Sequence, residues 1–356
     1  MINKLILFTS IIIFSYCDTV EDKQIPFLQY NWEISTLQNL NIDEDKIEYA
    51  FQKAAELSYI NSFLIIRNGK IAAEKYFNGY NKYSYFSIKS VSKSFLSSAI
   101  GIAIDQEIIS PGDSLTKILN EYKPVITDNR FNNITIQHLI NMKSGLDKDE
   151  NIYMTMVESN NWLSTIFKTS IVNKPGEKFI YSTCGTHLLS AVLTKVSGLT
   201  SLEYLRDNLL SKMEIEINDW KRDPQGFYFG GNDMYFSTRN MAVLGLLYLN
   251  NGIINNKQIV PKRWVENSLE IHAGGTGAWG VMKNIGYGNL WWLGEIDNYK
   301  VFMALGHGGQ FVLCVPELDL IIATNSYSEI WWDEANIQEL AILDIIGNYI
   351  IPAVNL

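Results

Sequence analysis

Cysteine and histidine are scarce in this chain of 356 residues, which has three cysteines and four histidines. Beyond the N-terminal segment only Cys184 and Cys314 remain. Nothing in their spacing requires a disulfide, so we expect two buried free thiols. The histidines do not form a His-Glu-x-x-His motif, which leaves a zinc site without support. We therefore expect neither a metal nor a cofactor.

Other features of known function classes are also missing. The net charge is -9 at pH 7 and no basic stripe is present, which disfavours nucleic acid as a partner. No Gly-x-Ser-x-Gly motif occurs, which excludes an ordinary α/β-hydrolase. Residues 275–280 fit Gly-x-Gly-x-x-Gly, but no strand precedes them and no clear helix follows, so we expect no nucleotide site. With 47% hydrophobic and 19% charged residues, the chain is globular and long enough for two cores.

Apolar runs long enough to span a membrane are absent as well, and the apolar run at the N-terminus is short. Residues 5–14 follow Lys4 and have the length of a signal-peptide core, too short to span a membrane. Cys17 comes directly after this core, and the segment resembles a bacterial lipoprotein cleavage site with Cys17 lipidated. Tyr16 departs from the small residue usual before that cysteine, so plain secretion and an uncleaved anchor remain open. We expect an exported protein, either periplasmic or a membrane-anchored lipoprotein, that meets the membrane only through this anchor.

The order of helix and strand patterns predicts one sheet built from distant parts of the chain. A helix is expected over residues 41–57, and Asn68 and Gly69 form the turn of a hairpin. Strand-like runs cluster between residues 290 and 324, whereas the middle of the chain has helical pieces joined by polar loops. We therefore expect four parts: a signal peptide over 1–17, a tether over 18–36, an α/β sheet domain over 37–110 and 236–356, and a helical insertion domain over 111–235.

A Ser-x-x-Lys motif from Ser90 to Lys93 carries the strongest chemical signal. It leads into the apolar residues 95–104, which predict a helix that starts near the serine. Residues three apart share a helix face, so the lysine can reach the serine hydroxyl. The free N–H groups of the first turn favour developing negative charge, and together these features activate a serine without a histidine. A second match, from Ser114 to Lys117, follows a turn and predicts only a helix cap.

Two segments downstream complete a pattern. Tyr181 follows a Pro-Gly turn at 175–176 and precedes a helical run. Residues 306–311 are glycine-rich and open a β-rich run, where small residues let a strand approach a ligand closely. Serine and lysine, then tyrosine, then a glycine-rich strand resemble the penicillin-recognising serine hydrolases. The resemblance is closest to the branch with class C β-lactamases, family VIII esterases and 6-aminohexanoate-dimer hydrolase, and three more segments share it: 134–146, 287–292 and 316–320.

The resemblance implies an α+β fold of the β-lactamase/transpeptidase type. An antiparallel sheet with terminal helices would meet an all-helical domain, with the active site in the cleft between them. Ser90 would be the nucleophile and Tyr181 the proton acceptor, assisted by Lys93. We expect the lysine and tyrosine to titrate as a pair: the ammonium lowers the pKa of Tyr181, and burial lowers that of Lys93. The amides of Ser90 and Gln310 would hold the oxyanion.

Two positions depart from the penicillin-binding pattern. Thr183 stands where an asparagine usually follows the tyrosine, and His307-Gly308-Gly309 stands where Lys-Thr-Gly is usual. A mostly neutral histidine holds a substrate carboxylate less well than a lysine does. We therefore expect a serine hydrolase that forms an acyl-enzyme with a small ester, amide or peptide, bound by these four residues. A β-lactamase or D-alanyl peptidase is one alternative. A non-catalytic cell-envelope binding lipoprotein is the other, and the intact serine, lysine and tyrosine argue against it.

Overall fold

The computed structural model describes residues 28–355, so the expected signal peptide, Cys17 and most of the expected tether lie outside the described residues. The last part of that tether is packed against the body. Trp32 is buried and its Nε1 donates to the carbonyl oxygen of Arg239 at 3.1 Å. Strand β1 (Glu33–Ile34) pairs in parallel with β3 (Lys70–Tyr76). The residues from 30 onward therefore belong to the folded body, because a buried indole and a strand pairing hold them there.

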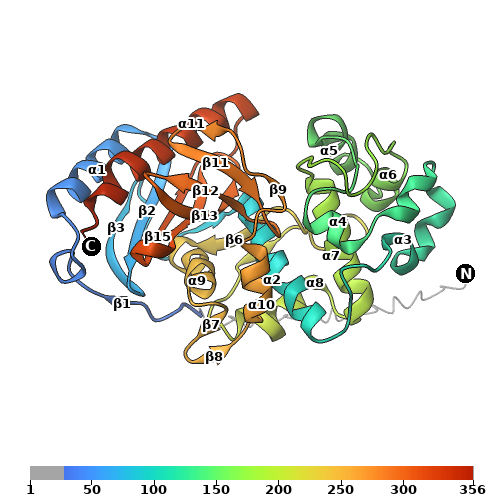
Figure 1. The fold of residues 1–356 in the computed structure, drawn as a ribbon, viewed down its shortest axis with the longest axis horizontal. Coiled ribbons are helices and arrows are strands. Elements are labelled where there is room, and N and C mark those ends of the chain that lie inside the picture. Colours follow the sequence, from blue (N-terminus) through green and yellow to red (C-terminus); the bar gives the residue numbers. More distant parts are fainter. Residues whose placement is uncertain (1–27, 356) are drawn as a thin grey trace, which may run out of the picture.

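A ten-stranded sheet forms the larger part of the molecule (Figure 1). Its main path runs β1-β3-β2-β15-β14-β13-β12-β11-β10, β9 pairs with β11, and every pair except β1–β3 is antiparallel. The strands come from residues 33–76 and 273–326, which confirms a sheet assembled from distant parts of the chain. The remaining strands are β2 (Ile60–Arg67), β9 (Ala273–Gly274), β10 (Ala278–Trp279), β11 (Met282–Tyr287), β12 (Trp292–Ile296), β13 (Tyr299–Gly306), β14 (Gln310–Val315) and β15 (Leu320–Ser326).

The predicted hairpin and terminal helices are present. Asn68 and Gly69 both have positive φ, at 51° and 69°, as a two-residue hairpin turn of the right twist requires. Helix α1 (Glu44–Glu56) begins after Asp43, whose side chain accepts from the amide of Lys46. Helices α1 and α11 (Trp332–Ile345) cover one face of the sheet (Figure 1). The opposite face packs against α2 (Ser92–Asp105), α9 (Thr238–Leu249) and α10 (Lys262–Ser268).

The middle of the chain is largely helical, as predicted. Its helices lie to the right of the sheet in Figure 1: α3 (Leu115–Ile118), α4 (Ile136–Ile140), α5 (Asp149–Val157), α6 (Trp162–Phe167), α7 (Thr183–Ser197) and α8 (Ser201–Leu205). A small sheet of β4 (Tyr85–Ser87), β6 (Met234–Ser237) and β5 (Asp219–Trp220) joins the two parts. One apolar core runs from α7 through α2 to the near face of the large sheet. This shared core fixes the helical part against the sheet.

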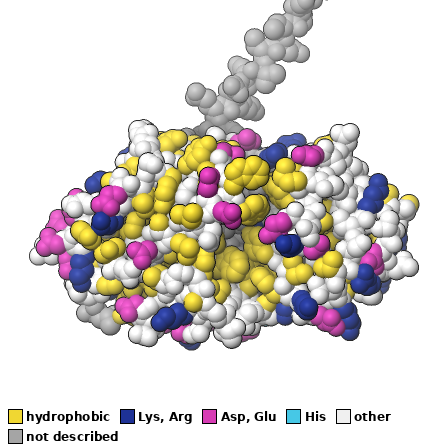
Figure 2. Space-filling model, turned by 90° about the horizontal axis from the view of Figure 1, so that it is seen from above, with side chains coloured by type: hydrophobic (Ala, Val, Ile, Leu, Met, Phe, Trp, Pro, Cys, Tyr) yellow, Lys and Arg dark blue, Asp and Glu magenta, His cyan; other side chains and the backbone are white. Residues whose placement is uncertain are grey.

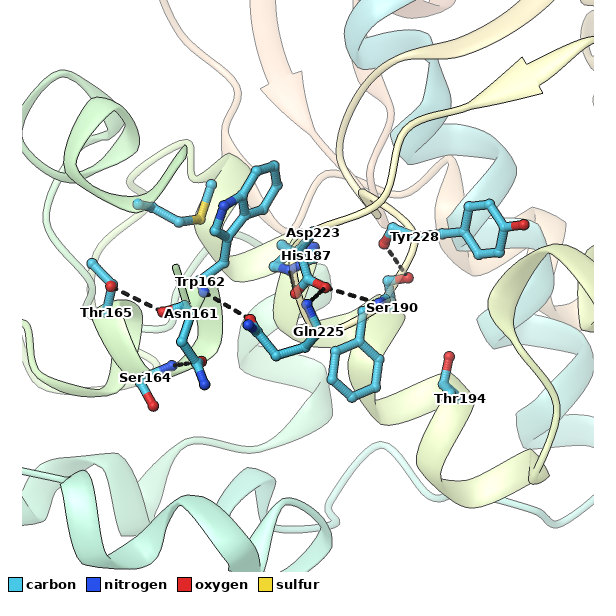
Figure 3. Close-up of polar contacts among 12 residues, drawn as sticks. Asn161, Trp162, Ser164, Thr165, His187, Ser190, Thr194, Asp223, Gln225 and Tyr228 are labelled. Carbon is cyan, nitrogen blue, oxygen red and sulfur yellow. Dashed lines mark hydrogen bonds and ion pairs between the residues drawn. The ribbon is translucent and has the colours of Figure 1, made fainter. Parts of the chain in front are cut away.

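A buried polar cluster holds the loop that leads from the helical part back to the sheet (Figure 3). His187 Nε2 on α7 lies 3.0 Å from Asp223 Oδ2, with neither side chain exposed. The amide of Trp162 donates to Gln225 Oε1 at 3.0 Å, and Ser190 Oγ donates to the carbonyl of Tyr228 at 2.7 Å. These contacts tie residues 223–228 to α6 and α7. The loop continues to Gly231, which contacts the site described below.

Cys184 on α7 and Cys314 on β14 are both buried free thiols. Within residues 28–355, every helix is too short or too polar to cross a membrane.

Candidate active site

Ser90 lies in a short 3₁₀ turn, η2 (Lys89–Val91), that leads directly into α2. The lysine one turn later points back at it, and Lys93 Nζ is 2.8 Å from Ser90 Oγ. The turn is wedged against the end of β13, since a side chain at Gly306 would meet the carbonyl oxygen of Ile88 at 2.4 Å. The structure therefore brings the predicted serine and lysine together where α2 meets the sheet.

Lys93 is buried, with 1% of its surface exposed, and its amine has three oxygen neighbours. Besides Ser90 Oγ these are Thr183 Oγ1 at 3.1 Å and the carbonyl oxygen of Gly231 at 2.7 Å. Burial lowers the pKa of Lys93 to about 7, as predicted, against the opposing charge of Asp149. A neutral amine has two N–H groups and one lone pair. When the neutral amine donates its two hydrogens to Thr183 Oγ1 and to the carbonyl of Gly231, its lone pair faces the serine hydroxyl.

Gly231 is required for this arrangement. A Cβ at this position would lie 2.2 Å from Thr186 Oγ1 and 3.2 Å from Lys93 Nζ. Only a glycine lets the loop bring its carbonyl so close to the amine.

Tyr181 forms the opposite wall of the lysine pocket. Its ring centroid is 4.9 Å from Lys93 Nζ and its ring stacks on Trp292, with centroids 5.8 Å apart. Burial raises the pKa of Tyr181, and a hydrogen bond with Ser90 opposes that shift. The expectation that the neighbouring ammonium lowers this pKa is wrong. Desolvation of the phenolate is the largest cause of the shift, and Lys93, whose own pKa is lowered to about 7, is not among its causes.

Asp149 is a buried residue of the site that the sequence did not reveal. It opens α5, and both of its carboxylate oxygens accept from the amide of Thr183, at 2.9 and 2.7 Å. Its charge also raises the pKa of Lys93. An acidic residue in the first turn of a helix is common for reasons of helix polarity alone, so no sequence signal distinguished this one.

The turn between β13 and β14 is held at almost every peptide group. Gly308 and Gly309 have φ of 80° and 101°, a backbone conformation that residues with a side chain rarely adopt. The amide of Gly308 donates to Glu339 Oε1 at 2.9 Å, and its carbonyl accepts from Ser326 Oγ. The carbonyl of Gly309 accepts from Thr324 Oγ1 at 2.9 Å. A loop fixed in this way can present a backbone amide in one direction.

The backbone amide that this turn directs away from β14 is that of His307. The amide of Gly309 donates to the carbonyl of Gly306, so this carbonyl points towards β14. In a trans peptide the next N–H points the opposite way, so the amide of His307 points away from β14. Gln310, the residue predicted for this role, is fully buried, and its side-chain nitrogen donates to the carbonyl of Ser326 at 2.9 Å. This side chain braces the turn and is not among those that line the cleft, whereas the role predicted for Gln310 belongs to its backbone amide.

A cleft of about 530 Å³ lies above these residues, with walls from both parts of the molecule. Lys89 pairs across it with Glu329 at 2.6 Å and with Asp233 at 3.4 Å. The imidazole of His307 lies 2.9 Å from the carbonyl of Ile330 through Nε2, and burial lowers its pKa. Within residues 28–355 no cluster of histidine, cysteine and acidic residues could hold a metal ion. The lining residues include Ser90, Tyr153, Met154, Tyr181, Thr183, Asn232, Trp292, Leu305, His307, Trp331, Trp332 and Glu339.

Comparison with known families identifies this constellation. Residues 61–341 match the model of the Beta-lactamase family, which is more than half of the chain. The chain belongs to the Beta-lactamase family. A 6-aminohexanoate-dimer hydrolase of Paenarthrobacter ureafaciens is 24% identical over 295 residues, covering 76% of this chain and 73% of its own.

Solved structures agree on the fold. EstCE1, described as a hydrolase with promiscuous acyltransferase activity, superposes with a TM-score of 0.71 at 17% identity and covers 87% of this chain and 99% of its own. An octameric penicillin-binding protein homologue from Pyrococcus abyssi has a TM-score of 0.65 at 21% identity and covers 85% and 76%. The family and these relatives make the protein an enzyme, a serine hydrolase with the β-lactamase/transpeptidase-like fold.

Proposed function

We propose that this hydrolase cleaves a small ester or amide through an acyl-enzyme formed on Ser90. The observation that carries the proposal is the 2.8 Å contact between Lys93 Nζ and Ser90 Oγ, made by a lysine whose pKa burial lowers to about 7. A lysine held in this way has a free amine for a large fraction of the time at neutral pH. A purely binding role would need no such pair.

In the first step, Ser90 Oγ bonds to the substrate carbonyl carbon while Lys93 takes the hydroxyl proton. We assign this proton to Lys93 and not to Tyr181, because burial leaves the phenol protonated and the amine partly free. The tetrahedral intermediate then expels the alcohol or amine, and the phenol of Tyr181 relays the lysine proton to it. Water attacks the acyl-enzyme with the same pair as base, which releases the acid and restores Ser90.

The negative charge of the intermediate needs two amide donors. The amide of Ser90 is one. For the other we favour His307 over Gln310, since the peptide orientation in the turn aims the His307 amide away from β14. Preorganised amides of this kind supply much of the stabilisation in acyl transfer.

The substrate preference follows from His307-Gly308-Gly309, which stands where Lys-Thr-Gly is usual. His307 offers an imidazole with a lowered pKa where a lysine would pair with a carboxylate, and charge-assisted hydrogen bonds are the stronger kind. We therefore favour esters and small amides over β-lactams and D-alanyl peptides. The hydrolase of 6-aminohexanoate dimer among the relatives fits an amide substrate of modest size.

The test compares kcat/KM for p-nitrophenyl butyrate with that for a cephalosporin. The ester should be preferred by at least ~10²-fold, about 2.7 kcal/mol of transition-state binding. His307→Lys should narrow that difference. Equal turnover of both substrates by the wild type would favour the β-lactamase alternative instead.

For location, the proposal is an exported lipoprotein anchored through Cys17. It rests on the cysteine that directly follows the short apolar core of residues 5–14. Mass spectrometry of protein made in a bacterial host should find an acylated N-terminus at this residue. A soluble product cleaved elsewhere would overturn the anchor and leave the chemistry untouched.

A further inference from the structure

Glu339 places a carboxyl group in the cleft without a cation to balance it. In the described part of the chain its carboxylate accepts from the amide of Gly308, and no lysine, arginine or histidine forms an ion pair with it. Lys89, the cation of the same cleft, is already engaged by Glu329 and Asp233. Charged groups removed from water are normally paired with an opposite charge, so a half-buried carboxylate that has only an amide donor can take a cation from a ligand.

Aromatic rings surround the same space. Tyr153 and Tyr181 line it on the side of the helical part, and Trp292, Trp331 and Trp332 line it on the side of the sheet. Trp331 is 80% exposed and Trp332 is 56% exposed, although both are large and apolar. Helices α11 and α5 lie at the top of the molecule in Figure 1, and Figure 2 shows this face from above. Hydrophobic side chains gather along its middle. Aromatic faces attract cations, and a carboxylate beside them adds its own charge attraction.

We propose that the cleft recognises ester or amide substrates that carry a positively charged ammonium group, with Glu339 as its counter-ion and the tryptophans of the rim around it. This inference rests on the proposed hydrolase function and specifies its substrate class. Glu339 acts here in substrate binding and takes no part in the proton transfers at Ser90.

The charge on Glu339 depends on pH. Burial raises the pKa of Glu339 to about 7, so the carboxylate is mostly protonated at pH 5.5 and mostly ionised at pH 8.5. The other titratable groups that face the cleft are Lys89, Tyr153, Tyr181, His307 and Glu329, with Lys93 behind the serine. The charged groups among them also act on a cation, so the comparison with Glu339→Gln isolates the effect of this carboxylate. In the wild type the ratio of kcat/KM for the cationic ester to that for the neutral ester should rise with pH through about 7, and in the variant most of that rise should be lost.

Two matched substrate pairs test this. Butyrylcholine and 3,3-dimethylbutyl butyrate differ only by a charge in the alcohol portion. The p-nitrophenyl esters of 4-(trimethylammonio)butyrate and 5,5-dimethylhexanoate differ only by a charge in the acyl portion. In at least one pair the cationic ester should be preferred on the order of 10-fold at pH 8.5, the scale of one contact to a charged group. The preference should shrink at pH 5.5.

Glu339→Gln keeps an acceptor for the Gly308 amide and removes the charge, so it should abolish the preference. Glu334→Gln, at an exposed position on the same helix, is the control and should keep it. A further measurement, inhibition by tetramethylammonium, uses only the wild type and so does not depend on whether the variant folds. Tetramethylammonium should inhibit hydrolysis of the neutral esters competitively, and more strongly at pH 8.5 than at pH 5.5.

The outcomes separate the two proposals. If neither pair is hydrolysed at all, the proposed function fails. If the neutral esters are hydrolysed as fast as the cationic ones at pH 8.5, or if Glu339→Gln retains the preference, the hydrolase stands and the role of Glu339 is refuted.

Discussion

Asp149 Oδ2 accepts a 2.7 Å hydrogen bond from the amide of Thr183, although the two residues are 34 positions apart in the chain. The contact joins the start of α5 to the start of α7, and Thr183 in turn accepts from Lys93. The same carboxylate raises the pKa of Lys93 against the effect of burial. Asp149 is thus a positioning residue that acts on the lysine through both geometry and charge.

Replacing Asp149 with asparagine should shift the pH dependence of activity. Without the negative charge, the pKa of Lys93 falls further, so the rising limb of kcat/KM against pH should move to lower pH. The variant should also lose about 1 kcal/mol of unfolding free energy, because a neutral acceptor replaces the charged one for the buried Thr183 amide. Glu150→Gln, at the exposed neighbouring position, should change neither property. A limb displaced to higher pH in Asp149→Asn would contradict this account.

The wild type should gain activity as pH rises through about 7. Lys93 must be neutral to take the proton of Ser90, and its lowered pKa means that the neutral amine is present above pH 7 and lost below it. The measurement is kcat/KM for a neutral ester between pH 5.5 and 8.5. The limb should persist in Glu339→Gln, which removes the other group with a pKa of about 7. A profile that is flat over this range would rule out Lys93 as the titrating base.

Lys93 and Tyr181 should behave as one unit. Lys93→Ala and Tyr181→Phe should each reduce kcat by roughly 10²–10⁴, the usual span for positioned acid–base groups. Because the proton passes along both groups, the double variant should lose far less than the product of the single losses. A double-mutant cycle on a butyryl ester measures this, and fully multiplicative losses would mean that the two residues act independently.

Much of this architecture could be predicted because it depends on local pattern. The Asn68-Gly69 turn has one favoured geometry, and the strand run at Gln310–Val315 coincides with β14. The spacing of Ser90 and Lys93 on one turn determined their contact. These features need only a few neighbouring residues to specify them.

The remainder depends on contacts between distant segments. Asp149 and Glu339 look like ordinary acidic residues, one near a helix start and the other on a helix face. Only the fold places Asp149 near Lys93 and Glu339 against the turn between β13 and β14. The direction of the Tyr181 pKa shift was mispredicted for a related reason. A neighbouring lysine is visible in the motif, whereas the depth of burial that raises this pKa depends on the packing around the pocket.

The most direct test of the central claim is covalent labelling of the nucleophile. Ser114 is the matched control, since it also begins a Ser-x-x-Lys sequence but lies at the N-cap position of α3, where its side chain makes no capping hydrogen bond and does not line the cleft. A fluorophosphonate probe should modify the wild type and Ser114→Ala, peptide mapping should place the adduct on Ser90, and Ser90→Ala should show neither adduct nor ester turnover. Labelling or turnover that survives in Ser90→Ala would contradict the assignment.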